Sequence, residues 1–309
     1  IRRQRQMCIR DRFKSFDKHI KELDWMSDAT KTKALEKLNK FTVKIGYPDK
    51  WKDYSGLQVK SLADGGNLIE DVMAISKWRQ AENLKDFGKP VDKTRWGMSP
   101  QTVNAYFNPT NNEIVFPAAI LQPPFYDYRA DAAVNFGGIG AVIGHEISHG
   151  FDDSGAKFDG DGNLVNWWTP QDEEKFAKAT KALATQYDGY EPVAGTHVNG
   201  TFTSGENIGD LGGASVAFDA LQMYLKDKGT YGNIDGYTPQ QRFFLSWATI
   251  WRTKATDEAL VNQVKTDPHS PGYYRSFGPI VNIDAFHDAF KTKPGDKLYK
   301  APKDRIRIW

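Results

Sequence analysis

The chain has 309 residues, of which 39% are hydrophobic, 13% aromatic and 26% charged, and its formal net charge is +2. A chain of this size and composition can bury a substantial core, so we expect one large domain or one domain with a small appendage. No apolar run approaches the ~18 residues of a membrane span, and the mean hydropathy is −0.60, which excludes a membrane-spanning segment in this sequence.

The first twelve residues carry the positive charge. They contain five of the 41 basic residues and one of the 39 acidic ones, so the rest of the chain has a net charge of −2. A nucleic-acid partner is therefore not expected. The run Met7–Arg12 looks like a translated sequencing-adapter scar, and we expect residues 1–12 to be an artefactual segment. The only cysteine, Cys8, lies within it, so the remaining chain has no disulfide.

The first half of the chain shows both helical and strand periodicity. Residues 13–23 and 27–38 predict helices, the second with Ser27 or Asp28 as its cap and with Lys33, Glu36 and Lys37 on its solvent-facing side. Residues 41–47 alternate like a strand. Two further short strands, 103–107 and 113–116, are joined by a turn-rich link and predict a hairpin. The other predicted helices are 67–87, 170–187, 204–227, 239–253 and 257–265.

An H-E-x-x-H run follows a small, apolar stretch, 131–144, that is typical of a buried helix. At 3.6 residues per turn, His145 and His149 project from one face and can bind one metal ion. Glu146, next to a ligand, can reach a metal-bound water as a general base. Two such histidines can also be a solvated or hydrogen-bonded pair, but histidines on a buried helix need a partner, which favours a zinc site.

A second apolar, glycine-rich helix offers the remaining ligand. Glu206 and Asp210 stand at i and i+4, so both carboxylates face the same way. A catalytic zinc ion commonly takes two histidines, one glutamate and a water, and a ligand histidine usually donates its other N–H to a carboxylate. Glu206 fits the third ligand and Asp210 the orienting carboxylate. The acidic loop 158–164 lacks the twelfth-position glutamate of an EF-hand, so calcium is not expected there.

These motifs resemble the neprilysin and endothelin-converting-enzyme family of zinc endopeptidases, in particular its bacterial, oligopeptidase-O-like members. The similarity runs from about Phe13 to Trp309 and includes the segments 103–107, 114–125 and 267–275. It implies an α+β, predominantly helical fold: a zincin, or thermolysin-like, catalytic domain with an HExxH active-site helix and a small β-sheet. It also implies one Zn²⁺ per chain. The absence of cysteine after residue 12 favours a bacterial source over the disulfide-rich animal relatives.

The resemblance also assigns roles that the residue types alone leave open. Asn104 and Ala105 would hold the substrate backbone, although Asn104 by itself is an ordinary strand-end residue. His269 would stabilise the oxyanion and Arg275 would grip a substrate carbonyl or carboxylate, although the His-Ser-Pro-Gly run by itself indicates only a turn. The residues matching the family's apolar substrate pocket, each of which is more simply a core residue, are Ile120, Phe125, Val142 and Trp251.

Family members are roughly twice as long as this chain, so the resemblance implies the C-terminal catalytic half. We expect residues 13–100 to be a helical remnant of a cap domain with its connection, and residues 101–309 to be the zinc endopeptidase domain. The expected activity is hydrolysis of oligopeptides on the amino side of hydrophobic residues; the alternative is a catalytically inactive peptide-binding relative. Membrane association would come only from sequence upstream. An envelope or extracellular location follows from the resemblance alone, with a cytoplasmic one open, and the oligomeric state is not predicted.

Overall fold

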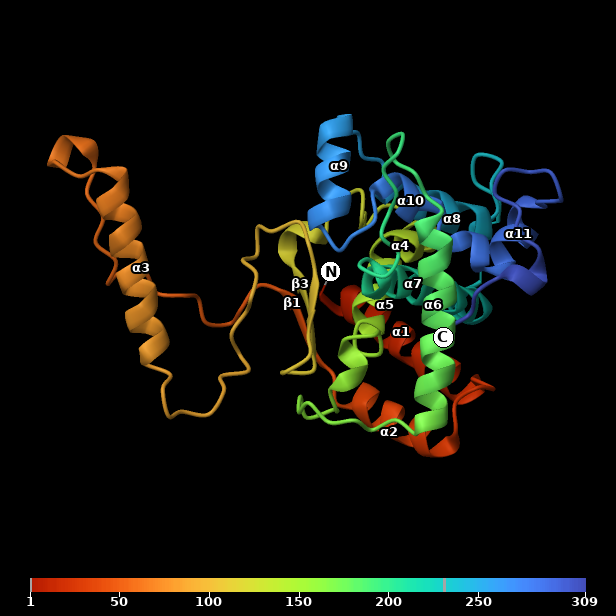
Figure 1. Ribbon diagram of the computed structural model, residues 1–309, viewed down its shortest axis with the longest axis horizontal. Coiled ribbons are helices and arrows are strands. Elements are labelled where there is room, and N and C mark those ends of the chain that lie inside the picture. Colours follow the sequence, from red (N-terminus) through yellow and green to blue (C-terminus); the bar gives the residue numbers. More distant parts are fainter. Residues whose placement is uncertain (1, 230–231) are drawn as a thin grey trace. The chain divides into compact units, whose positions relative to one another are not determined.

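The computed structural model describes residues 2–229 and 232–309, and the chain forms two compact units. One unit comprises Ile1–Gly46 and Gln101–Trp309, and the other comprises Tyr47–Pro100. The first unit is mostly helical with a small sheet, which confirms the expected fold class (Figure 1). Its helices are α1 (Arg2–Glu22), α2 (Asp28–Asn39), α4 (Ala132–Asn135), α5 (Ala141–Ser148), α6 (Pro170–Asp188), α7 (Ser204–Lys228), α8 (Pro239–Ile250), α9 (Asp257–Thr266), α10 (Gly272–Phe277) and α11 (Asp284–Phe290).

The helices predicted from periodicity are confirmed, with ends that differ by a few residues, except that α1 begins upstream of residue 13. The short helices α10 and α11 were not predicted, because six or seven residues span too few turns to display a periodic apolar pattern. The exposed side assigned to Lys37 is wrong: its side chain is buried, together with those of Thr30, Ala34 and Leu38 on the same face of α2.

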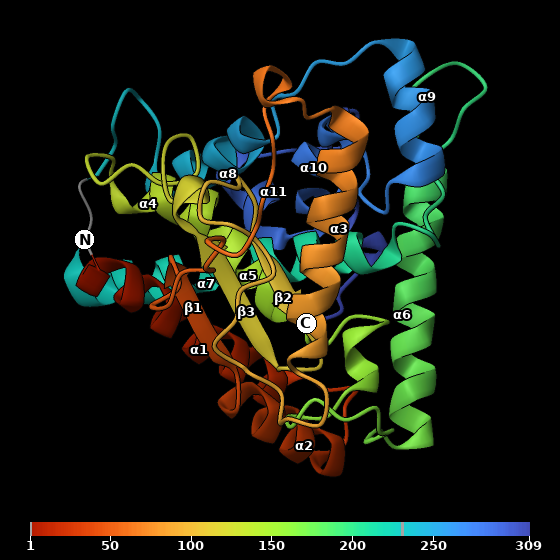
Figure 2. The same cartoon turned by 90° about the vertical axis from the view of Figure 1, so that its left-hand side faces the viewer.

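Three strands form a sheet in the order β1-β3-β2 (Figure 2). The central strand β3 (Glu113–Pro117) is buried along its whole length, pairs in parallel with β1 (Thr42–Gly46) and pairs antiparallel with β2 (Tyr106–Asn108). The predicted hairpin is therefore confirmed, and β2 is its edge strand. β2 starts later than expected: the side chain of Asn104 accepts a hydrogen bond from the backbone N–H of Ala105, a local turn in place of ladder pairing.

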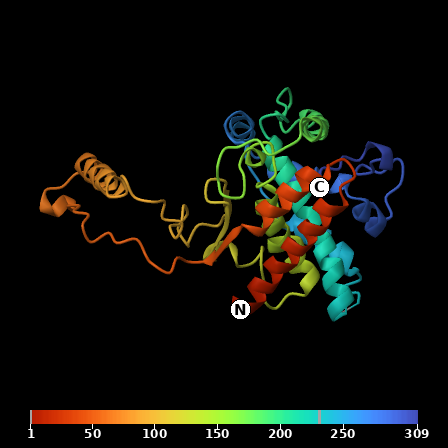
Figure 3. The same ribbon diagram turned by 90° about the horizontal axis from the view of Figure 1, so that it is seen from below.

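The N-terminal helices belong to the first unit. α1 lies alongside α7 and also contacts α2 and α5 (Figure 3). Arg12 is fully buried, with its guanidinium 3.6 Å from the centroid of the Phe136 ring. The first division between the two units falls after residue 46, because β1 pairs with β3 of the later sequence. The origin of residues 13–100 as a cap-domain remnant with its connection stays a prediction. The artefactual origin expected for residues 1–12 stays a prediction.

The apolar stretch before the H-E-x-x-H run is not the single regular helix that its composition suggested. α4 passes into a π-helical segment, Phe136–Gly140, before α5 begins, and Gly138 has the non-helical angles φ −88° and ψ −106°. The cause is the carbonyl of Phe125, which accepts a hydrogen bond from the N–H of Ile139 at 2.7 Å. A Cβ at Gly138 would lie 2.4 Å from that oxygen, so only glycine permits this insertion into the helix.

The second unit contains η1 (Leu62–Asp64) and α3 (Leu68–Leu84), whose Asn67 cap accepts a hydrogen bond from the N–H of Glu70. α3 has no buried residue, and large apolar side chains along it are exposed. This unit therefore has little core of its own. Its exposed apolar residues on α3 include Leu68, Ile69, Val72, Met73 and Leu84.

Asp172 joins the beginnings of α2 and α6. It is 1% exposed, and its carboxylate accepts hydrogen bonds from the hydroxyls of Ser27, Thr30 and Thr169, the last two at 2.7 Å. Burial alone would raise the pKa of Asp172, but these hydrogen bonds from Ser27, Thr30 and Thr169 lower it to about 2. The ionised carboxylate therefore stabilises the fold.

We expect Asp172→Asn to lower the free energy of unfolding by about 2 kcal/mol at neutral pH, the equivalent of the pKa shift. Because the folded-state pKa lies below the unfolded value of 3.8, this stabilisation is present above that value and is lost as the pH falls towards 2. Denaturant titrations at neutral pH and near pH 3 measure it, with the exposed Glu174→Gln as control. A loss that is the same at both pH values would contradict this account.

Candidate metal centre and active site

The close approach of α5 to α7 positions the site. A Cβ at Gly144 would lie 2.7 Å from the backbone oxygen of Gly213, and one at Gly213 would lie 2.5 Å from the backbone nitrogen of His145. One turn earlier on α7, a Cβ at Gly209 would lie 2.8 Å from Nδ1 of His145. The missing side chains therefore let the two helices pack backbone to backbone, and they leave room for the His145 ring between them.

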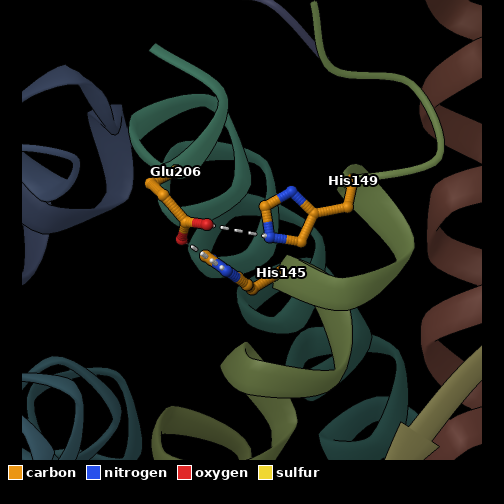
Figure 4. A group of neighbouring side chains, drawn as sticks. All are labelled: His145, His149 and Glu206. Atoms are coloured by element: carbon orange, nitrogen blue, oxygen red, sulfur yellow. Dashed lines mark ion pairs between the residues drawn. The ribbon is translucent and has the colours of Figure 1, made fainter. Parts of the chain in front are cut away.

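His145, His149 and Glu206 converge between these helices, and their ligand atoms all lie within 4.8 Å of one another (Figure 4). Nε2 of His145 is 3.2 Å from Oε2 of Glu206, and Nε2 of His149 is 3.6 Å from Oε1. The two imidazole rings are nearly perpendicular, with centroids 4.5 Å apart. Two imidazole nitrogens and one carboxylate are a donor set of catalytic zinc, so these residues fit that metal.

Both histidines are oriented by buried carboxylates. Nδ1 of His145 is 2.9 Å from Oδ1 of Asp210, and Nδ1 of His149 is 2.7 Å from Oδ2 of Asp152. With Nδ1 held in each ring, Nε2 is the nitrogen presented to a metal ion. Asp210 was predicted for this role, but Asp152 was missed. Its position three residues after His149, about one helical turn on, was the available signal.

The electrostatics of the centre favour a cation. Burial opposes ionisation of Glu206, but hydrogen bonds from His145 and His269 lower its pKa. Burial likewise opposes protonation of His145, yet Asp210 and Glu206 raise its pKa to about 10. The carboxylates that favour a proton on His145 in the metal-free protein would equally favour a metal ion in its place.

Glu146 lies on α5 beside the candidate metal ligand His145 and is 4% exposed. Burial raises its pKa, against the lowering effect of the two nearby histidines. Its Oε2 is buried without a hydrogen-bond partner among the described residues. A carboxylate with a raised pKa and no competing donor is suited to accept a proton from a water molecule.

His269 and Arg275 also contact the carboxylates of Glu206 and Asp210. Nε2 of His269 is 3.0 Å from Oε2 of Glu206, and its Nδ1 is 2.6 Å from Asp267, a supporting residue that the sequence did not single out. Arg275 binds Asp210 through Nε at 2.8 Å and Nη2 at 2.7 Å. The guanidinium also lies 3.8 Å from the Trp251 ring centroid. Arg275 therefore holds the carboxylate that orients a ligand histidine.

The other predicted substrate residues are placed less directly. Asn104 is exposed and Ala105 is buried, both immediately before the edge strand β2. The four residues of the predicted apolar pocket lie in the main core or pack against it; Ile120 and Val142 are buried, and Phe125 and Trp251 are partly buried. Their roles toward a substrate stay predictions.

Among the described residues, no helix combines the length and the apolar character of a membrane span. A model of peptidase family M13 matches residues 104–306, and a second model of that family matches residues 6–48. The second match begins within the segment 1–12 that we expected to be artefactual.

Neprilysin-3 of Drosophila melanogaster is 38% identical over 315 residues, which cover 97% of this chain and 38% of that protein. The neutral endopeptidase of Lactococcus lactis subsp. cremoris is 41% identical over 297 residues, which cover 96% of this chain and 45% of the relative. The Mycobacterium tuberculosis zinc metalloprotease Zmp1, whose crystal structure was solved with an inhibitor, is 50% identical in sequence. The two structures match with a TM-score of 0.94, and the match covers 100% of this chain and 47% of the Zmp1 chain. This chain thus spans less than half the length of each relative. It belongs to peptidase family M13.

Proposed function

We propose that this chain is the catalytic part of a zinc endopeptidase that hydrolyses oligopeptides on the amino side of hydrophobic residues. The observation that carries the proposal is the convergence of His145, His149 and Glu206 within 4.8 Å, with Glu146 buried beside them. The similarity of this chain to a neutral endopeptidase and to a zinc metalloprotease supports the same activity.

The residues of the site have different proposed roles in the reaction. Zinc bound by His145, His149 and Glu206 would supply Lewis acidity towards water and the scissile carbonyl. Glu146 accepts the proton of the attacking water and passes it to the leaving amine. Nε2 of His269, whose side chain is 39% exposed, contacts Glu206 in the metal-free structure. With Glu206 bound to zinc, Nε2 would be free to donate a hydrogen bond to the carbonyl oxygen as that oxygen gains negative charge.

An extended peptide would bind along β2. This strand is at the edge of the sheet, and Asn104 is exposed just before it, so a substrate backbone can add to the strand while Asn104 and Ala105 bind it. Val142 lies three residues before His145 on α5, and Trp251 lies under Arg275. These positions support an apolar pocket near the metal centre that includes Ile120 and Phe125 as well.

We also propose that residues 13–100 include a helical remnant of a cap domain with its connection. The chain spans less than half of its relatives, and α3 exposes apolar side chains that a larger cap would cover. Such a cap would limit substrates to short peptides.

A fluorogenic peptide with an internal hydrophobic residue tests the activity, assayed with and without a zinc chelator. Cleavage that stops on chelation and returns with zinc supports the proposal. Peptide binding without cleavage by the zinc-loaded protein would support the alternative, an inactive peptide-binding relative.

We expect purified protein to contain one zinc ion per chain and Glu206→Ala to lose most of it, because the variant removes the only carboxylate among the proposed ligands. Elemental analysis under non-chelating conditions measures the zinc content. Exposed Glu174→Ala is the matched control and should keep its zinc. Equal zinc in the Glu206→Ala variant would contradict the ligand assignment.

Glu146→Gln separates proton transfer from metal binding. The amide keeps the shape of the side chain but cannot accept the proton, so we expect turnover to fall at least ~100-fold. Zinc content should stay the same, since Glu146 is not a proposed ligand. Comparable turnover in this variant would mean that another group activates the water.

His269→Ala should lower kcat roughly 100-fold with a smaller change in KM, because the oxyanion exists only in the transition state. Steady-state kinetics on the fluorogenic peptide measure both constants. His197→Ala removes an exposed histidine of the loop before α7 and serves as the control. An effect on KM alone would indicate that His269 binds the substrate in its ground state.

A further inference from the structure

Lys37 is a buried cation that the proposed reaction does not use. It is 1% exposed and lies on the face of α2 that packs into the first unit, beside Ala34 and Leu38. Phe107, Phe151 and Trp167 surround its ammonium, with ring centroids 5.8, 5.6 and 6.0 Å from Nζ. A lysine in such a setting is costly to bury, so its hydrogen bonds indicate what it does there.

The amine of Lys37 binds the segment that follows α5. Nζ donates hydrogen bonds to the backbone carbonyls of Gly155 and Phe158, both at 2.7 Å. Burial lowers the pKa of Lys37 to about 7, against the opposing charges of Asp152 and Asp159. A neutral amine still has two N–H donors, one for each carbonyl, so the two hydrogen bonds can persist on either side of that pKa.

From Gly155 the hydrogen bonds continue to the metal centre. The N–H groups of Ser154 and Gly155 donate to Oδ1 of Asp152 at 2.9 and 2.6 Å. The other oxygen, Oδ2, lies 2.7 Å from Nδ1 of His149. The segment packs closely against the end of α5, since a Cβ at Gly155 would lie 1.8 Å from the backbone oxygen of His149. The carbonyl of Gly155 thus accepts a hydrogen bond from Lys37, and the N–H of Gly155 donates one to Asp152.

We propose that Lys37 is a positioning residue for the metal centre: by holding the 152–158 segment it fixes the carboxylate of Asp152 and, through it, the ring of His149. The inference rests on the proposed function, because it gives His149 the role of a zinc ligand. It assigns to α2 a part in metal binding, although α2 carries none of the proposed metal ligands.

The test is a double-variant cycle on zinc affinity, measured by competition with a chromophoric chelator. Lys37→Met keeps the length of the side chain and removes its donors; Asp152→Asn weakens the hold on His149 directly. Orienting partners of zinc ligands typically contribute 10–100-fold in affinity, so we expect roughly 10-fold from Lys37→Met and at least as much from Asp152→Asn. The double variant should lose no more zinc affinity than Asp152→Asn alone, because both substitutions act through the contact between Asp152 and His149.

Lys40→Met is the matched control. Lys40 directly follows α2 as its C-cap residue and pairs with Asp161, just beyond the 152–158 segment. It is exposed, and its ion pair is with Asp161, not with Asp152. It should keep the zinc affinity of the unsubstituted chain. Thermal unfolding of the metal-free variants separates a loss of stability from a loss of metal binding.

Three outcomes would overturn the role of Lys37: an unchanged zinc affinity in Lys37→Met, losses that multiply in the double variant, or an equal loss in Lys40→Met. If Lys37→Met does not fold, Lys37→Gln is used in the same cycle, since its shorter side chain cannot reach both carbonyls; unchanged affinity there overturns the role equally. Absence of zinc binding by the unsubstituted chain would instead contradict the proposed function itself.

Discussion

The backbone-to-backbone contact of α5 and α7 is the constraint on which the site depends. Gly144 and Gly213 face each other where any side chain would collide with the opposite main chain. A larger separation would move Glu206 and Asp210 away from His145, which both carboxylates contact. Small residues at this contact therefore serve the metal site as well as the packing of the helices. The glycine-rich sequence of α7, unusual for a long helix, follows from that need.

Bringing so many carboxylates into one buried region is costly unless cations compensate them. Glu146, Glu206 and Asp210 are each at most partly accessible, and Asp152 is buried next to them. Arg275 offsets part of this charge by pairing with Asp210, and the protonated histidines offset more in the metal-free protein. A divalent cation would replace protons on the histidines and retain the compensation. A bound metal ion would therefore stabilise the folded site.

Much of the site could be predicted from the sequence because it depends on helical spacing. The i and i+4 positions place His145 with His149, and Glu206 with Asp210, whatever the rest of the fold does. Asp152 escaped prediction because it acts where the chain leaves α5, beyond the helical pattern. The π-helical segment could not be predicted, since its cause is the carbonyl of Phe125 from another segment. Lys37 lies three residues after Ala34, a spacing that places both on one face of α2, so its burial could be predicted in part. Its charge, however, favoured an exposed position.

Arg275, which is predicted to bind the substrate, is connected to the candidate metal centre through Asp210. Oδ1 of Asp210 lies 2.7 Å from Nη2 of Arg275 and 2.9 Å from Nδ1 of His145, so one oxygen serves both. Removing the guanidinium would leave a buried carboxylate with one partner fewer and would free it to turn away from the histidine. A weaker affinity for peptides after such a change would therefore not by itself identify Arg275 as a substrate-binding residue. Arg275→Lys keeps the charge but cannot bind both oxygens of Asp210 in the same way, so the variant separates the geometric contribution from the electrostatic one.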